Sequence, residues 1–257
     1  MNLQELFREP AAFFDQAIYR VAAVLIALCC HEWGHAYVAH LCGDDTAKEA
    51  GRMTLNPLAH LDPLGTVLMF FAGVGFARPV PVNPYRFKGN RVRCDLLVSL
   101  AGIGVNLILF LLFTVGMCIT SRLMWKPEVM KEVGLTTLVS YRYTAVWSIM
   151  TGEGAQRYGS FLASPQLLPL VRLCALTAYV NLSLALFNLL PLPPLDGYHV
   201  FNDILFGGRI QLSRRGFQIA MVIVMVLALQ GFLGRIIVFA LRPLQDLVLL
   251  PFGALWG

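Results

Sequence analysis

The sequence has few charged residues. Only 14% of its 257 residues are Asp, Glu, Lys or Arg, whereas an average soluble domain has about 25%. Hydrophobic residues make up 57% of the chain, and the mean hydropathy is +0.66. This composition excludes an ordinary soluble domain. It predicts an all-α polytopic membrane protein that has the lipid bilayer as a partner.

The chain also lacks the features of several other classes. Its six cysteines form no C-x-x-C pair, which argues against a disulfide framework or a cysteine zinc site. The first residues, MNLQELFREPAAFFDQ, mix both charges and do not resemble a signal peptide. We attribute the net charge of +5 to loops that set membrane topology, and expect no nucleic-acid partner. With no internal repeat or linker, residues 1–257 are predicted to form one domain.

Four segments are long and apolar enough to span a bilayer, which takes about 20 residues. They are residues 18–42, 96–120, 173–195 and 216–241. The short glycine-rich segment 63–77 and the proline-rich stretch after it predict a re-entrant or β-hairpin element following the first helix. Residues 136–150 and the C-terminal stretch are further candidates, so we expect about 4–6 membrane segments in all.

The stretch ALCCHEWGHAYVAH places ionisable residues at the end of the first apolar segment. His31 and His35 are four residues apart, so on a helix both imidazoles reach one metal ion. Glu32 is placed to take a proton from water, which completes the H-E-x-x-H pattern of zinc hydrolases. The pattern also occurs by chance, but ionisable residues in a membrane helix suggest a functional site. His40 falls on the opposite face and is interpreted as an interfacial histidine.

A catalytic zinc ion usually has three protein ligands, so a third is needed. Asp196 is favoured because it follows the proline-broken run NLLPLPPL at the end of the third span. Irregular backbone at membrane depth is tolerated only where it is buried in protein or lines a wet cavity. His60, in the polar loop LNPLAHLDPLG, is the alternative ligand. Asp95 and Asp203 lie at segment edges, where a solvated charge is the simpler interpretation.

Other polar and extended residues are candidates for substrate binding. Asn106 and Asn188 lie within the spans, where they either bond neighbouring helices or bind substrate backbone. Val80, Val82 and Asn83 belong to the proline-rich stretch. We expect this stretch to offer an edge on which an unwound peptide pairs as a strand.

Several separated motifs together carry a family resemblance. The segments HEWGH, GRMTLNPLAHLDPLGT, GFARPVPVNP, AGIGVN and NLLPLPPLDG occur in that order, over about residues 18–120 and 170–215. They resemble the site-2 protease family of intramembrane zinc metalloproteases, in particular its compact bacterial branch without a PDZ domain. The family often has proline where this chain has Ile103, so the local helix entry is expected to differ.

The resemblance implies a function and a site. His31, His35 and Asp196 would hold one catalytic Zn²⁺ between the three core helices, 18–42, 96–120 and 173–195, and Glu32 would activate water. The substrates would be transmembrane proteins or peptides, cut in or near their membrane segments. The protein would lie in the cell membrane as a multi-pass protein, with its site towards the cytoplasmic side.

The sequence also leaves open functions other than proteolysis. The same His/His/Asp set suits a membrane metal-ion transporter or sensor, although transporters often carry internal repeats. An inactive relative would be expected to lose part of this set. Residues 121–165 match no motif and are expected to form either a cap or further membrane segments. Neither the substrate nor the oligomeric state is indicated.

Overall fold

The computed structural model describes residues 7–62, 65, 78–210 and 212–256. These residues form helices and loops, with no β-strand among them, which confirms the all-α prediction. Within the same ranges, four helices are long and apolar enough to cross a membrane. The protein is therefore a polytopic membrane protein, at the lower end of the predicted number of segments.

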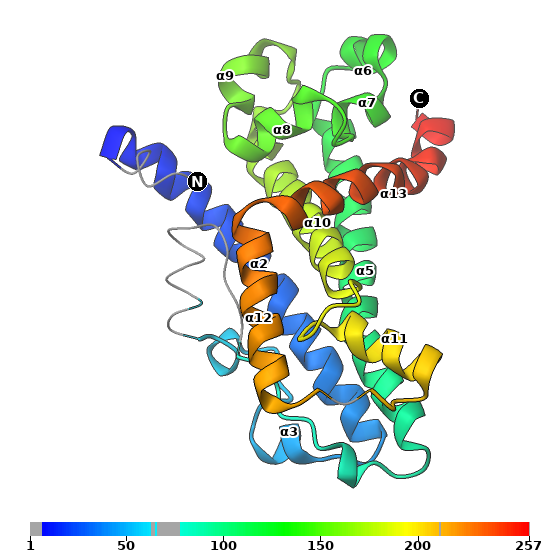
Figure 1. Cartoon of the computed structure of the whole chain (residues 1–257). Helices are drawn as coiled ribbons and strands as arrows, with labels where there is room; N and C mark the ends of the chain where they lie inside the picture. The colour runs from blue at the N-terminus through cyan, green and yellow to red at the C-terminus, as the bar shows by residue number, and fades with distance from the viewer. Residues whose placement is uncertain (1–6, 63–64, 66–77, 211, 257) are drawn as a thin grey trace.

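Three long helices form the centre of the molecule: α2 (Pro10–Leu41), α5 (Arg91–Met124) and α10 (Leu168–Asn188). Each packs against the other two (Figure 1). At about 1.5 Å per residue, the 34 residues of α5 extend about 51 Å, more than the hydrocarbon thickness of a bilayer. The first two core helices were predicted with shorter bounds, because polar ends that continue a helix outside the lipid carry no hydropathy signal. The third was predicted at 173–195 but is shifted towards the N-terminus, because the apolar residues after Asn188 contain prolines and leave the helix.

Local sequence sets the ends of these helices. Pro10 is the first residue of α2, where a proline costs no hydrogen bond. The helix stops before Gly43, which has a φ of 96° that favours glycine. Asn90 starts α5 by accepting a hydrogen bond from Arg93 N at 3.0 Å. The third helix, α10, ends at Asn188, just ahead of the prolines that exclude helical backbone.

The predicted span at 216–241 is wrong, because two helices occupy this region. Helix α12 (Arg214–Leu229) and helix α13 (Phe232–Trp256) are separated by Gly231, whose φ is 71°. The fourth helix able to cross a membrane is Leu233–Leu255. Hydropathy alone does not detect this break, because the residues on both sides are equally apolar.

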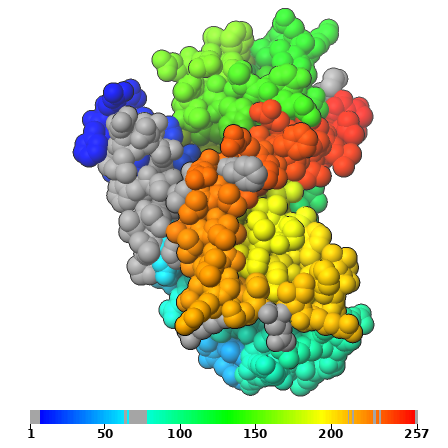
Figure 2. Space-filling view, viewed as in Figure 1, coloured from blue at the N-terminus to red at the C-terminus, as the bar shows by residue number. Residues whose placement is uncertain are grey.

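Residues 121–165 mainly form a cap. Its helices are α6 (Pro127–Val133), α7 (Leu135–Val139), α8 (Thr144–Thr151) and α9 (Gly154–Tyr158), followed by the short helices η3 (Gly159–Phe161) and η4 (Pro165–Leu167). All are far too short to span a bilayer, so the cap alternative is the correct one. Figures 1 and 2 show the cap and α13 at one end of the molecule, and α3 (Thr46–Glu49) at the other.

The cap is tied to two of the long helices by buried hydrogen bonds. Tyr141 is fully buried and donates its hydroxyl to Ala175 O of α10 at 2.9 Å. Its backbone N–H donates to Gln245 of α13 at 2.7 Å, and the Gln245 amide donates to Val139 O at 3.1 Å. Cap, α10 and α13 therefore form one packed unit.

Most of the predicted re-entrant or β-hairpin element, residues 63–64 and 66–77, lies outside the described residues. The part that follows, residues 78–83, belongs to no helix or strand. The prolines after Arg78 and Val80 favour extended backbone at these two residues, and Asn83 is extended. This part runs into the short helix η2 (Pro84–Arg86), and the helix η1 (Pro57–Ala59) precedes the element. The extended segment passes beside α2, where Val80 contacts Glu32 of the H-E-x-x-H motif.

Candidate metal centre

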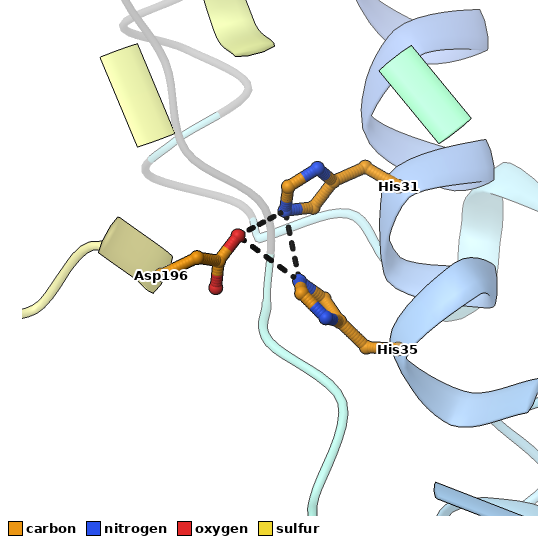
Figure 3. Close-up of side chains that lie close together, drawn as sticks. All are labelled: His31, His35 and Asp196. Atoms are coloured by element: carbon orange, nitrogen blue, oxygen red, sulfur yellow. Dashed lines mark hydrogen bonds and ion pairs between the residues drawn. The ribbon is translucent and has the colours of Figure 1, made fainter. Parts of the chain in front are cut away.

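Three side chains from distant parts of the chain converge at one point. Figure 3 shows His31 and His35, one turn apart on α2, both pointing at Asp196. Asp196 is the first residue of α11 (Asp196–Phe206). Its Oδ2 lies 3.2 Å from His31 Nε2 and 3.4 Å from His35 Nε2, and the two Nε2 atoms are 2.9 Å apart. The three ligand atoms thus lie within reach of a single metal ion.

The contact of His35 with α5 orients its ring towards the centre of the cluster. His35 Nδ1 lies 2.7 Å from Val98 O of α5. A carbonyl oxygen only accepts, so Nδ1 carries the proton and a neutral His35 turns the lone pair of Nε2 inward. That lone pair faces His31 Nε2 and a carboxylate oxygen, so a cation bound between the three atoms would be coordinated by all of them. Two imidazoles and a carboxylate are a common donor set for zinc.

Two glycines bring the long helices together at this point. A Cβ atom on Gly102 of α5 would lie 2.5 Å from His35 Nε2 and 2.6 Å from His31 Cε1. On the facing side, a Cβ on Gly34 of α2 would lie 2.9 Å from the side chain of Val105. The backbone of α5 therefore forms one wall of the metal centre. The sequence prediction missed this role, although Gly102 in the motif AGIGVN could have suggested close helix packing.

The third ligand, Asp196, is positioned by the turn that connects α10 to α11. Gly197 follows Asp196, and a Cβ there would lie 2.4 Å from the carbonyl oxygens of both Leu189 and Leu190. Only glycine allows α11 to start so close to the end of α10.

Glu32 is buried beside the cluster, with 9% of its surface exposed. Its Oε2 accepts a hydrogen bond from the backbone N–H of Val80 at 2.8 Å. Val80 is also buried and packs with Ala36 of α2. The motif glutamate and the extended segment, predicted separately, are therefore in direct contact.

The remaining predicted substrate-binding residues differ in their surroundings. Asn106 is fully buried on α5, and neither atom of its carboxamide meets a partner among the described residues. Asn188, the last residue of α10, is half-buried, as is Val82. The side chain of Asn83 accepts from Tyr85 N at 3.1 Å and so caps η2. Asn106 is the one of these whose hydrogen-bonding groups are buried and still available.

Other polar residues weighed in the sequence lie outside the cluster. His60 is buried in the loop before the undescribed element, with Nε2 2.7 Å from Thr54 O, and it takes no part in the metal cluster. His40 lies 2.5 Å from Asp45. Asp203 is only 7% exposed, so the prediction that it is a solvated charge is wrong. Its burial, with nearby Asp95, raises the pKa of Asp203 to about 6.

Comparisons with known proteins agree with this arrangement. A model of peptidase family M50 matches residues 19–231. YwhC of Bacillus subtilis, whose name describes a zinc metalloprotease, is 39% identical over 186 residues, covering 72% of this chain and 68% of YwhC. Rip2 of Mycolicibacterium smegmatis and Rip2 of Mycobacterium tuberculosis, described by name in the same way, are 27% and 28% identical. The match covers 58% of the length of each Rip2 protein. No solved structure matches.

Proposed function

We propose, from the premise that the chain belongs to peptidase family M50 and is a membrane zinc metalloprotease, that it cuts peptide bonds in or near transmembrane segments of other membrane proteins. In this proposal His31, His35 and Asp196 hold the zinc ion and Glu32 is the general base. The convergence of these three ligand atoms inside a bundle of membrane helices is the observation that carries it.

The chemistry assigns a task to each residue. When bound, zinc polarises a carbonyl group and lowers the pKa of water. The Glu32 carboxylate accepts a proton from the attacking water and returns it to the leaving amine. Asn106, whose amide is buried without a partner among the described residues, donates a hydrogen bond to the substrate backbone or to the developing oxyanion. The helices exclude bulk water, which strengthens these interactions.

The substrate must reach the centre in an extended form, because a helix hides its carbonyl groups in its own hydrogen bonds. We propose that residues 78–83, of which Val80 contacts Glu32, receive the unwound segment as a paired strand. Alternate residues of an extended chain present their N–H groups to the same side. Val82 would therefore present its N–H to the side on which Val80 meets Glu32.

Substrates with weak helices are therefore expected to be cut faster. The probe is a transmembrane peptide of about 20 apolar residues, with a fluorophore and quencher at its ends and a Gly-Pro pair at its centre. Replacing that pair by Leu-Leu is expected to lower kcat/KM at least tenfold, because glycine and proline together destabilise a helix by about 4 kcal/mol. The peptide with its Gly-Pro pair moved to one end is the control. Equal rates for the central pair and Leu-Leu would contradict the unwinding step.

Asp196→Asn is expected to weaken zinc binding by more than the roughly 10- to 100-fold that loss of an outer-shell partner costs. An amide is neutral and a poorer ligand than a carboxylate. The measurement is competition with a zinc chelator, using the full chain in detergent. Asp45→Asn is the matched control, because Asp45 pairs with His40 outside the cluster. Equal zinc affinity in the two variants would remove Asp196 from the site.

The location of the protein is also part of the proposal. We propose that it is a multi-pass protein of the cell membrane, that residues 1–257 form one domain, and that the metal centre faces the cytoplasm. Arg86, Lys88, Arg91 and Arg93 follow the extended segment near the α3 end of the fold, and clustered basic residues favour the cytoplasmic side. Labelling of single cysteines in intact cells tests this orientation.

A further inference from the structure

Glu32 has a partner that its proposed role as general base does not explain. It is a buried carboxylate, and a buried charge is stable only when it is paired or hydrogen-bonded. The donor is the backbone N–H of Val80, 48 residues away in the sequence, at 2.8 Å. A backbone N–H carries no charge and keeps its proton, so it acts towards Glu32 only as a hydrogen-bond donor.

The sequence around Val80 fixes this donor in place. Val80 lies between Pro79 and Pro81, which have no N–H, so it carries the one amide proton of the three residues. Proline fixes its own φ and restricts the residue before it to extended backbone. Arg78 and Val80 each precede a proline and are restricted in this way. Little conformational entropy is then lost when the N–H is aimed at Glu32.

Contacts on both sides anchor the segment to the protein. The Arg52 guanidinium donates to Pro79 O at 2.7 Å and to Ala59 O at 3.0 Å. Arg78 N donates to His60 O at 2.8 Å. Further along, the backbone N–H of Asn83 donates to the buried Asp44 at 2.6 Å. The backbone on both sides of the Val80 amide is therefore held by hydrogen bonds, at Arg78 and Pro79 before it and at Asn83 after it.

We propose that Val80 is a positioning residue for the reaction, and that Arg52 supports it from outside the site. The Val80 N–H holds one carboxylate oxygen of Glu32, so that the other oxygen is directed to the water it deprotonates. This inference rests on the proposed function of Glu32. It adds a backbone group that no side-chain motif contains, and it predicts that Val80 N–H is not used to pair with substrate.

Hydrogen exchange tests the contact without any need for activity. In the zinc-free full chain in detergent, the fragment covering residues 78–83 contains the Val80 amide. Glu32→Ala is expected to speed the exchange of one deuteron in this fragment, because the acceptor is lost. Glu49→Ala, which removes an exposed carboxylate paired with Arg86, is the control. Equal exchange in wild type and Glu32→Ala would overturn the proposal even if the protein proves to be an active protease.

Kinetics with the Gly-Pro probe peptide test the consequence. Val80→Pro removes the N–H while keeping the extended backbone, and is expected to lower kcat about 10- to 100-fold, the loss typical of a misplaced catalytic group. KM and zinc content are expected to stay at their wild-type values. Val80→Ala loses side-chain packing but keeps the N–H, and its kcat is expected to be at least tenfold above that of Val80→Pro.

Two outcomes would overturn the positioning role. Equal loss of kcat in both Val80 variants would show that side-chain packing alone matters, and a higher kcat in Val80→Pro would show that the contact restrains Glu32 instead. If Val80→Pro does not fold, Arg52→Gln carries the test, with the exposed Lys48→Gln as its unchanged control. A wild-type kcat in Arg52→Gln would then refute the proposal.

Discussion

Glu32→Gln is expected to abolish peptide hydrolysis while zinc stays bound. Glutamine has the size of glutamate, and its carbonyl oxygen still accepts the hydrogen bond from Val80 that Glu32 accepts at 2.8 Å. It cannot take a proton from water, and loss of general acid–base catalysis typically costs about 10²- to 10⁴-fold in rate. The measurement is kcat with the transmembrane probe peptide, together with zinc content by elemental analysis.

A control separates this effect from a general loss of carboxylate charge. Glu49 is an exposed residue of α3 that forms an ion pair with Arg86 of η2, so Glu49→Gln removes a carboxylate outside the metal centre. Its activity is expected to equal that of the wild type. Normal cleavage by Glu32→Gln would show that another group is the base, and zinc loss in this variant would show that Glu32 is structural.

Gly102→Ala is expected to be as damaging as loss of a metal ligand, although Gly102 carries no functional group. The new Cβ would lie 2.5 Å from His35 Nε2 and 2.6 Å from His31 Cε1, so both rings must leave their positions. We expect zinc affinity to fall at least about 100-fold, beyond the range seen for outer-shell changes, and proteolysis to fall with it. Chelator competition and the probe peptide measure the two effects.

The same helix supplies the matched control. A Cβ on Gly104 meets no atom of the described chain within 4 Å, so Gly104→Ala is expected to keep its zinc. Alanine favours helix by about 1 kcal/mol at either position, which means that weaker helix formation cannot explain a difference between the variants. Wild-type zinc affinity in Gly102→Ala would show that α5 does not pack on the ligands as described.

The parts of the fold that depend on hydropathy could be predicted from the sequence. The three core helices are long apolar segments, and such segments are helical in lipid because their backbone groups need internal partners. The division of 216–241 at Gly231 could not be predicted, because hydropathy does not report the φ of a glycine. The cap could not be assigned either, since its helices are stabilised by distant residues such as Gln245.

The residues of the candidate site that have distinctive side-chain chemistry could be predicted from the sequence. His31, His35 and Asp196 stand out because ionisable groups are rare in apolar segments, and the structure brings them together. Gly102 and the Val80 amide went unrecognised, because their contributions are a missing atom and a backbone group. Such roles depend on which segments are in contact in the folded chain, and the spacing of residues in the sequence does not reveal those contacts.

The hydrogen bonds of Gln245 also bear on how the protein is assembled during synthesis. The Tyr141 amide and its Gln245 acceptor are 104 residues apart. At about 5–20 residues per second, a ribosome needs about 5 to 20 s to make the chain between them. Throughout this interval the Tyr141 amide lacks its native acceptor. The native contacts of the cap can therefore be completed only after α13 has been made, long after the metal ligands of α2.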